Sequence, residues 1–247
     1  MKVDGGKVAS FTEIVDRVSG ANKGSTMQDA MGFKDGEDWS FKKDMVAAEF
    51  DKHVREQLPW YDIMSGAVAH IARHYIPEDG TVLDLGCSTG NVGNLLETAL
   101  VARSVKFIPV DNAQSMLDIY QGPGTPILKD FTEPEWTIPE FDVAILFLSM
   151  MFTPANRREA FIEKLLASKR KGGCIIVVDK TESYGGYIGT IMARLTLAGK
   201  LATGTSEKDI VAKELSLIGV QRPIDINQWP NAVEVFRFGE FAGWIIE

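Results

Sequence analysis

The sequence predicts an α/β fold: a doubly wound, mainly parallel sheet of seven strands, preceded by N-terminal helices and closed by an antiparallel hairpin. Short apolar runs alternate with helix-like segments from Thr81 to Lys180, a pattern typical of a parallel sheet with helices on both faces. The stretch AVEVFRFGEFAGWIIE differs, because it contains two strand-like runs joined near Gly239. The last two strands are therefore expected to form a terminal hairpin.

Size and composition narrow the functional classes. A chain of 247 residues with 45% hydrophobic and 24% charged residues is typical of one large globular domain. The net charge of −8 argues against broad non-specific binding to nucleic acid, which needs a basic surface. We expect no membrane span and no signal peptide. Cys87 and Cys174 are not expected to form a disulfide, which favours a reducing, cytoplasmic compartment. The sequence leaves open whether the protein forms a homodimer.

The chain is expected to begin with a flexible arm over residues 1–38, which are rich in Gly, Ser, Lys and Asp. The folded domain would then span residues 39–247. Its first helix follows from DWSFKKDMVAAEFDKHV, in which Met45, Val46, Phe50 and Val54 share one face. Pro59 interrupts this pattern, and a second helix is expected from Tyr61 to Tyr75.

The alternating region supplies the other elements. Strands are predicted at residues 81–85, 105–111, 125–130, 141–148 and 173–180. Helices are predicted for AQSMLDIY, for PANRREAFIEKLLASK and for residues 186–199. Lys169-Arg170-Lys171 is interpreted as a solvated helix end.

A glycine loop follows the first predicted strand in TVLDLGCSTGNVGNLL. Its spacing is Asp84-x-Gly86-x-Ser88-x-Gly90, and apolar residues then recur at helical spacing. Strand, glycine loop and helix together bring backbone N–H groups and a helix N-terminus close to a ligand. A single glycine loop is a weak signal, because many nucleotide-binding folds contain one.

Acidic residues at three strand ends make the signal more specific. Asp84 precedes the loop, Asp111 ends the second strand, where it can hold ribose hydroxyls, and Asp130 ends the third. The three-glycine pyrophosphate motif and the Gly-Lys-Ser/Thr motif are both missing from the loop. These acids favour a ligand with positive charge and no phosphate. S-adenosylmethionine, with its ammonium, sulfonium, ribose and adenine, is such a ligand.

The chain resembles the class I methyltransferases, whose fold is Rossmann-like and whose cofactor is S-adenosylmethionine. Within them it is most similar to the carboxy-S-adenosyl-methionine synthases of tRNA wobble-uridine modification, from about Trp39 to Glu247. The matching motifs are DWSF, LPWYDIM, DLGCSTG, VDNAQSML, FLSMMFTPANRREAFIEKL, GGCIIVVDK, ATGTSEKDI and VEVFRFGEFAGWIIE.

The resemblance implies a role for each of ten residues. Asp84, Gly86, Ser88 and Gly90 would hold the amino-acid half of the cofactor, Asp111 the ribose, Asn112, Met116, Asp130 and Phe131 the adenine, and Tyr61 the methionine end. Tyr61 is also ranked first as a general base, ahead of Ser149, Lys180 and Tyr184.

The sequence departs from the synthases at two positions. Leu146 stands where an Asn is expected to contact the cofactor, and Glu214 stands where an Arg is expected to pair with the extra carboxylate. The neighbouring residue, Lys213, matches the pattern of the synthases. Because Glu would repel a carboxylate that Arg would bind, we expect the ordinary cofactor to be preferred.

Structural interpretations compete with the functional ones. Asp111 alone would suit a helix N-cap, although the three acids together favour a ligand. His53, His70 and His74 are expected on helices without a metal site, and Trp229 and Trp244 in the core. Three functions stay open: a methyltransferase on a small molecule, RNA or protein, a carboxy-S-adenosyl-methionine synthase, and a non-catalytic cofactor-binding regulator.

Overall fold

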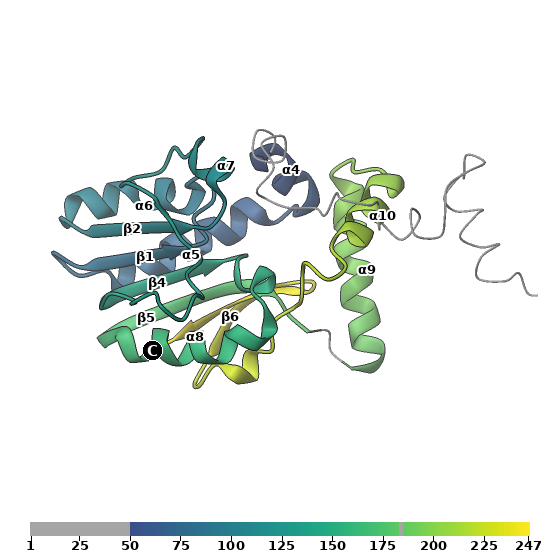
Figure 1. Cartoon of the computed structure of the whole chain (residues 1–247). Helices are drawn as coiled ribbons and strands as arrows, with labels where there is room; N and C mark the ends of the chain where they lie inside the picture. The colour runs from purple at the N-terminus through teal and green to yellow at the C-terminus, as the bar shows by residue number, and fades with distance from the viewer. Residues whose placement is uncertain (1–49, 183–184) are drawn as a thin grey trace, which may run out of the picture.

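The computed structural model describes residues 50–182 and 185–247 of the chain. The predicted arm over residues 1–38, the start of the first helix and Tyr184 lie outside the described residues. The described part contains a seven-stranded sheet with the order β3-β2-β1-β4-β5-β7-β6 (Figure 1). The strands are β1 (Thr81–Leu85), β2 (Lys106–Asp111), β3 (Ile127–Leu128), β4 (Phe141–Phe147), β5 (Lys169–Lys180), β6 (Val233–Phe238) and β7 (Phe241–Ile246).

The first five strands pair in parallel, and the last two form the antiparallel end of the sheet. β1 lies between β2 and β4, with Asp84 opposite Pro109 and Ile145. β7 pairs antiparallel with both β5 and β6 and therefore lies between them. The predicted fold class and the terminal hairpin are confirmed.

Two predicted boundaries at the sheet are wrong. The third strand is confined to Ile127–Leu128, because it is an exposed edge strand that follows Pro123 and Pro126. The basic run at 169–171 does not end a helix but begins β5. Arg170 there pairs with Asp142 at 2.8 Å, across the register shift between β4 and β5.

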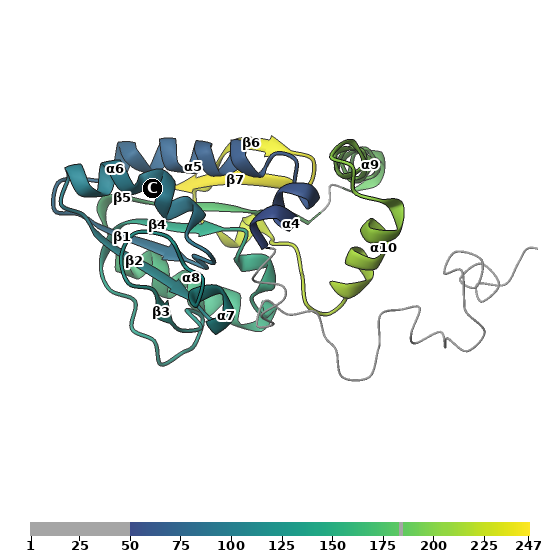
Figure 2. The same ribbon diagram turned by 90° about the horizontal axis from the view of Figure 1, so that it is seen from above.

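Helices cover both faces of the sheet (Figure 2). They are α4 (Phe50–Gln57), α5 (Tyr61–Tyr75), α6 (Asn91–Ala102), α7 (Gln114–Leu117), α8 (Ala155–Ser168), α9 (Gly186–Ala202) and α10 (Glu207–Ser216), with the 3₁₀ turns η1 (Met150–Phe152) and η2 (Ile226–Gln228). α5 and α6 lie on one face, and α8 lies on the other. This two-sided cover explains why the central strands are almost continuously apolar.

Alternate residues of each central strand enter two separate cores. On β4, Ile145 and Phe147 pack with residues of α5 and α6. Leu146 points to the opposite face and packs with α8 and the C-terminal segment. Trp229 and Trp244 are buried in this second core, as expected from the sequence.

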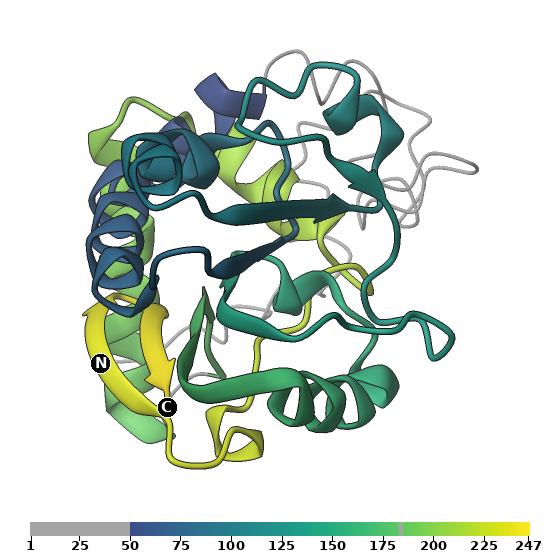
Figure 3. The same ribbon diagram turned by 90° about the vertical axis from the view of Figure 1, so that its left-hand side faces the viewer.

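The segment between β5 and β6 carries α9 and α10, which stand beside the sheet at the end where α4 lies (Figures 1 and 2). Two contacts join these helices to α4: the hydroxyls of Thr203 and Thr205 donate to the carbonyl oxygen of Glu56, at 2.7 and 3.1 Å. Viewed from the side, the terminal hairpin lies next to α9 (Figure 3). The three helices α4, α9 and α10 therefore lie together at one end of the sheet (Figures 1 and 2).

Candidate active site

A cavity of about 220 Å³ lies where the parallel strands end. Its walls come from the glycine loop, from the segments after β2, β3 and β4, and from α4, α9 and α10. Nine of the ten predicted site residues line it: Tyr61, Asp84, Gly86, Ser88, Asp111, Asn112, Met116, Asp130 and Phe131. Gly90 does not line it. The sheet brings these residues together because the carboxyl ends of parallel strands share one edge.

The two loop glycines have different structural tasks. Gly86 has φ +91°, and an added Cβ would lie 2.5 Å from Cβ of Ser149, so a larger residue would force the loop away from the segment after β4. Gly90 has φ +94° and caps α6, with backbone nitrogen of Gly122 2.5 Å from the position of its missing Cβ. Gly90 therefore shapes the loop from behind the cavity.

Asp84 is a buried carboxyl group with an unsatisfied oxygen. It is 1% exposed, and its Oδ2 has no hydrogen-bond partner among the described residues. Burial, together with the charge of Asp111, raises the pKa of Asp84 to about 7. A buried polar atom normally has a partner, so this oxygen has unused capacity to accept a hydrogen bond inside the cavity.

Asp111 holds the loop as well as facing the cavity. Its Oδ2 accepts a hydrogen bond from the Ser88 N–H, and its Oδ1 accepts one from the Ala113 N–H, each at 2.9 Å. Burial raises the pKa of Asp111, and these backbone donors oppose that rise. Each carboxylate oxygen has a second lone pair, so the backbone contacts leave acceptor capacity for two ribose hydroxyls.

At the predicted adenine end of the site, the carboxylate of Asp130 already bonds to other protein groups. Asp130 Oδ1 accepts from the amide and hydroxyl of Thr132, at 2.9 and 2.6 Å, and its Oδ2 lies 3.2 Å from Arg157 Nη1. Phe131 is buried and packs against Phe161 with ring centroids 5.2 Å apart. Met116 is 1% exposed and lines the same wall. The apolar wall suits a flat aromatic ligand.

Tyr61 begins α5 and is buried at the cavity wall, with its ring edge-on to Phe147 at 5.4 Å. Burial raises the pKa of the Tyr61 phenol well above its usual range, although the Arg55 guanidinium opposes this rise. The phenol is therefore protonated at neutral pH and suits hydrogen-bond donation, which weighs against the predicted role as a general base.

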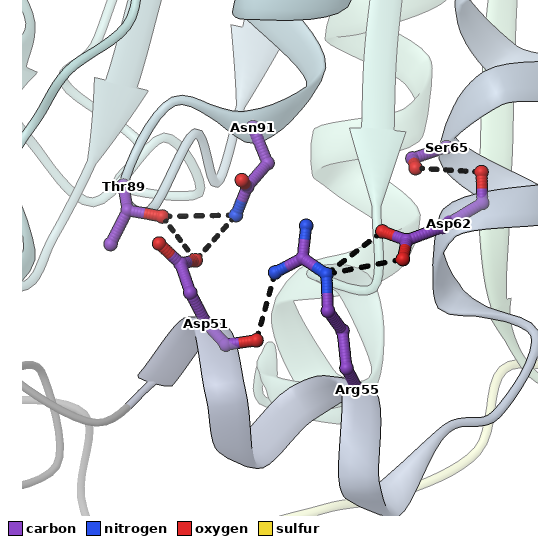
Figure 4. A network of polar contacts seen from close by, with 6 residues as sticks. All are labelled: Asp51, Arg55, Asp62, Ser65, Thr89 and Asn91. Carbon is purple, nitrogen blue, oxygen red and sulfur yellow. Dashed lines mark hydrogen bonds and ion pairs between the residues drawn. The ribbon is translucent and has the colours of Figure 1, made fainter.

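α4 is attached to the glycine loop by a polar network (Figure 4). Asp51 Oδ1 accepts from Thr89 Oγ1 at 2.9 Å and from Asn91 Nδ2 at 2.6 Å. Arg55 donates to the Asp51 carbonyl oxygen at 2.8 Å and to Asp62 Oδ1 at 2.9 Å. Asp51 thus joins the helix that covers the cavity to the loop that forms its base. The sequence motifs gave no signal for this connection.

The far end of the cavity is lined by three lysines and one glutamate: Lys180, Lys200, Lys213 and Glu214. Lys200 is 7% exposed, and its Nζ lies 2.7 Å from Glu214 Oε1. Glu214 is therefore ion-paired with a buried lysine, and its repulsion of an added carboxylate stays a prediction. Burial, reinforced by Lys200 and opposed by Glu214, lowers the pKa of Lys213 to about 7.

Two further cavity residues carry unsatisfied polar atoms. Gln57 Oε1 and Thr196 Oγ1 are buried and, within the described part of the chain, have no hydrogen-bond partner. Sequence reasoning missed both, since no motif surrounds them. At the end of β4, the strand alternation places Phe147 at the cavity wall and Leu146 in the opposite core, so Leu146 does not line the cavity.

The remaining candidate groups of the described ranges are the metal-ligating side chains, the two cysteines and the histidines of α5. Residues 50–182 and 185–247 hold no cluster of three metal-ligating side chains. Cys87 and Cys174 are both unpaired and buried, and burial raises the pKa of each thiol. His70 and His74 are exposed on α5. No helix in the described ranges has the length and apolar content needed to cross a membrane.

The fold is a Rossmann-like α/β fold, a mainly parallel sheet with an antiparallel C-terminal pair. A solved structure of an O-methyltransferase family protein from Burkholderia thailandensis superposes with a TM-score of 0.54 at 12% sequence identity. The match covers 83% of this chain and 60% of that chain. This likeness establishes the fold.

In sequence, the chain is similar to curated proteins named carboxy-S-adenosyl-L-methionine synthase, as its motifs indicate. The protein from Staphylococcus epidermidis is 26% identical over 211 residues, which cover 83% of this chain and 91% of the relative. The protein from Shewanella woodyi is 26% identical over 208 residues, which cover 81% of this chain and 85% of the relative. No family model matches the chain.

Proposed function

We propose that the protein is an S-adenosylmethionine-dependent methyltransferase that acts on a small acceptor enclosed between the strand ends and the helices α4, α9 and α10. The observation that carries the proposal is the buried, unpartnered Oδ2 of Asp84 beside the glycine loop. An ammonium group would supply the missing donor and would hold Asp84 ionised. The names of the curated relatives support the same cofactor.

The proposal assigns a group of cavity residues to each part of the cofactor. Asp84 would bind the ammonium group, Asp111 the ribose hydroxyls, and Met116 and Phe131 the adenine face. Tyr61 would cover the methionine end and donate a hydrogen bond there. The cofactor, when bound, supplies an activated methyl group on a sulfonium. The protein then contributes alignment, exclusion of water and, for an acceptor that carries a proton, a base.

Mass spectrometry of the purified chain tests the proposal at the level of the cofactor. We expect co-purified S-adenosylmethionine or S-adenosylhomocysteine, and calorimetric binding of the latter. Asp84→Asn should weaken that binding at least tenfold, because a neutral amide replaces the partner of an ammonium. Asp79→Asn, on the exposed turn before β1, is the matched control and should bind like the unmodified chain. Unchanged binding by a folded Asp84→Asn variant would remove the proposed site.

A second candidate function is carboxy-S-adenosyl-methionine synthesis, favoured by the names of the relatives and by the lysines at the far end of the cavity. We rank it second because an added carboxylate would compete with Glu214 for Lys200, which are already 2.7 Å apart. Competition between S-adenosylmethionine and its carboxylated analogue separates the two functions. Tighter binding of the analogue would favour the synthase. Cofactor binding without turnover of any acceptor would favour a regulatory protein.

A further inference from the structure

Helix α9 exposes apolar residues and buries polar ones, which reverses the usual arrangement of a surface helix. Its buried residues are Gly189, Thr196 and Lys200. On the outer side, six large apolar side chains are 42–71% exposed: Tyr187, Ile188, Ile191, Leu195, Leu197 and Leu201. They are six of the sixteen exposed large apolar side chains in residues 50–182 and 185–247. Single exposed apolar residues need no explanation, whereas a concentration of them on one helix indicates an interaction surface.

The exposed face of α9 has the residue spacing of a helix that packs against another helix. Ile188, Ile191, Leu195, Ala198 and Ala202 follow one another at intervals of three, four, three and four residues. Paired helices carry apolar residues at these intervals, and all five residues are exposed here. The two alanines allow a partner helix to approach closely, because the side chains at a contact set the distance between helix axes. We call these five residues the α9 seam.

The exposed apolar area of α9 is close to what one partner contributes to a stable interface. A large side chain presents roughly 150–250 Å² of surface, so six that are about half exposed present on the order of 600 Å². The largest apolar patch on a monomer is about 300–600 Å², and a standard interface buries roughly 800 Å² per partner. The small residues between the six and a polar rim around them would supply the remaining area.

The charges on α9 indicate what kind of partner this face accepts. The charged residues of the helix are Arg194 and Lys200, and Lys200 is buried with its Nζ 2.7 Å from Glu214. A helix that binds a lipid surface normally carries many Lys and Arg residues beside its apolar face, and the net charge of −8 would be repelled by anionic lipid. An uncharged apolar seam suits a second copy of itself, because a two-fold axis brings the same surface of both copies together.

We propose that two copies of this chain associate through α9, with the seam of one copy packed against the seam of the other. The inner face of the same helix contributes Thr196 and Lys200 to the wall of the cavity. Each α9 therefore lies between its own cavity and the partner copy. The association supports from outside a wall that, within the described part of the chain, is exposed along most of its length.

Sedimentation equilibrium of the whole chain tests the association directly. The unmodified chain should sediment with twice the mass of one chain at micromolar concentration. Ile191→Glu places a carboxylate in the seam and should weaken the dimer at least about 100-fold, because each copy would bury a charge without a partner. Val101→Glu on α6 is the matched control, since Val101 is 75% exposed and lies outside α9, and it should dimerise like the unmodified chain. Circular dichroism should show that both variants are folded.

Cross-linking asks whether the contact lies at the seam. Cys87 and Cys174 are buried, so a cysteine introduced at the surface is the accessible thiol. Leu195→Cys, in the middle of the seam, should form a covalent dimer with a short bismaleimide, seen by denaturing electrophoresis. Val101→Cys should stay at the mass of one chain under the same conditions. Adding Ile191→Glu to Leu195→Cys should abolish the cross-link.

Four results would overturn the proposal. A dimer that survives Ile191→Glu would place the interface on another surface. A monomeric chain that binds phosphatidylcholine vesicles, and loses them in Ile191→Glu, would assign the face to lipid. A monomeric chain in which Leu195→Cys is slow to react with N-ethylmaleimide would assign it to another segment of the same chain, and rapid reaction would leave it without an occupant. None of these measurements uses the cofactor, so their failure would be distinct from a failure of the proposed methyltransferase function.

Discussion

Two carboxyl groups at the strand ends are fully buried but differ in their partners. Asp84 leaves one oxygen without a partner among the described residues. Asp179 accepts hydrogen bonds from the amides of Met150 and Met151 at 2.8 and 3.3 Å and so fixes the turn η1 after β4. Burial raises the pKa of each to about 7. Asp179 is thus a structural acid, whereas Asp84 has capacity for a ligand.

At the residue scale, binding of S-adenosylhomocysteine should depend on pH through Asp84. Below pH 7 the unliganded carboxyl group is protonated, and an ammonium ligand requires it ionised, so binding releases a proton. Affinity should therefore rise about tenfold per pH unit up to about pH 7 and then level off. Calorimetry between pH 5.5 and 8.5 checks this. A flat profile in the unmodified chain, or the same slope in Asp84→Asn, would contradict the assignment.

A second residue-scale prediction concerns Asp111. Asp111→Ala should weaken cofactor binding by about 1.5–3 kcal/mol, because hydrogen bonds to a charged acceptor are lost. The substitution also removes the acceptors of the Ser88 and Ala113 amides, so circular dichroism must first show a folded variant. Asp118→Ala, at the exposed residue that directly follows α7, is the control, expected to bind normally. Unchanged affinity of a folded Asp111→Ala variant would end the ribose assignment.

At the element scale, α4 depends on polar contacts to stay over the cavity. Asp51→Ala should raise the Kd for S-adenosylhomocysteine about three- to tenfold with little change in stability. Its carboxylate connects α4 to Thr89 and Asn91, whereas Phe50, Val54 and Gln57 on the same helix line the cavity. Calorimetry and a urea titration measure the two quantities.

Lys52→Ala is the matched control on α4, because its side chain is 83% exposed and lies 3.8 Å from Glu56. It should change neither quantity. If Asp51→Ala binds as tightly as Lys52→Ala, the attachment of α4 to the glycine loop has no part in binding.

The elements also mark the limit of what sequence reasoning could reach. The strands and the hairpin were predictable because hydrophobic periodicity is local, and Asp84, Asp111 and Asp130 could be placed together because parallel strands align their carboxyl ends. Tyr61, Asn112, Met116 and Phe131 were expected at the site only through the family resemblance. Gln57, Thr196 and Lys200 line one cavity because the turn after α9 contacts the end of α4, and no local motif encodes that contact. The sequence match placed Leu146 at a cofactor contact, but its neighbour Phe147 lines the cavity instead. A match that is wrong by one residue on a strand exchanges the two faces of the sheet. The roles of the site residues remain predictions.

At the scale of the whole molecule, Arg158 connects distant parts of the chain. It is 3% exposed and donates to the carbonyl oxygens of Met151, Thr153, Arg222 and Pro223 at 2.6–3.4 Å. One guanidinium thereby joins the turn after β4 to the segment that leads from α10 to β6. This contact determines where the α9–α10 segment rejoins the sheet.

Arg158→Met should lower the free energy of unfolding by about 3 kcal/mol or more, because several buried carbonyl groups lose a charged donor together. Arg157→Met, the same change at the exposed neighbour, should cost less than about 1 kcal/mol. Urea unfolding followed by tryptophan fluorescence measures both variants. Equal stabilities of the two variants would show that the buried guanidinium is not a structural connection.

The position of β7 has a consequence for biosynthesis. β5 ends at Lys180, but the strand that covers its open edge begins only at Phe241. At about 5–20 residues per second, a ribosome needs several seconds to make residues 181–240. During that time the edge that carries Ile175, Ile176 and Val177 has no neighbour on that side, and such edges recruit foreign strands. The nascent chain is therefore most vulnerable to aggregation after its glycine loop and central strands have already been made.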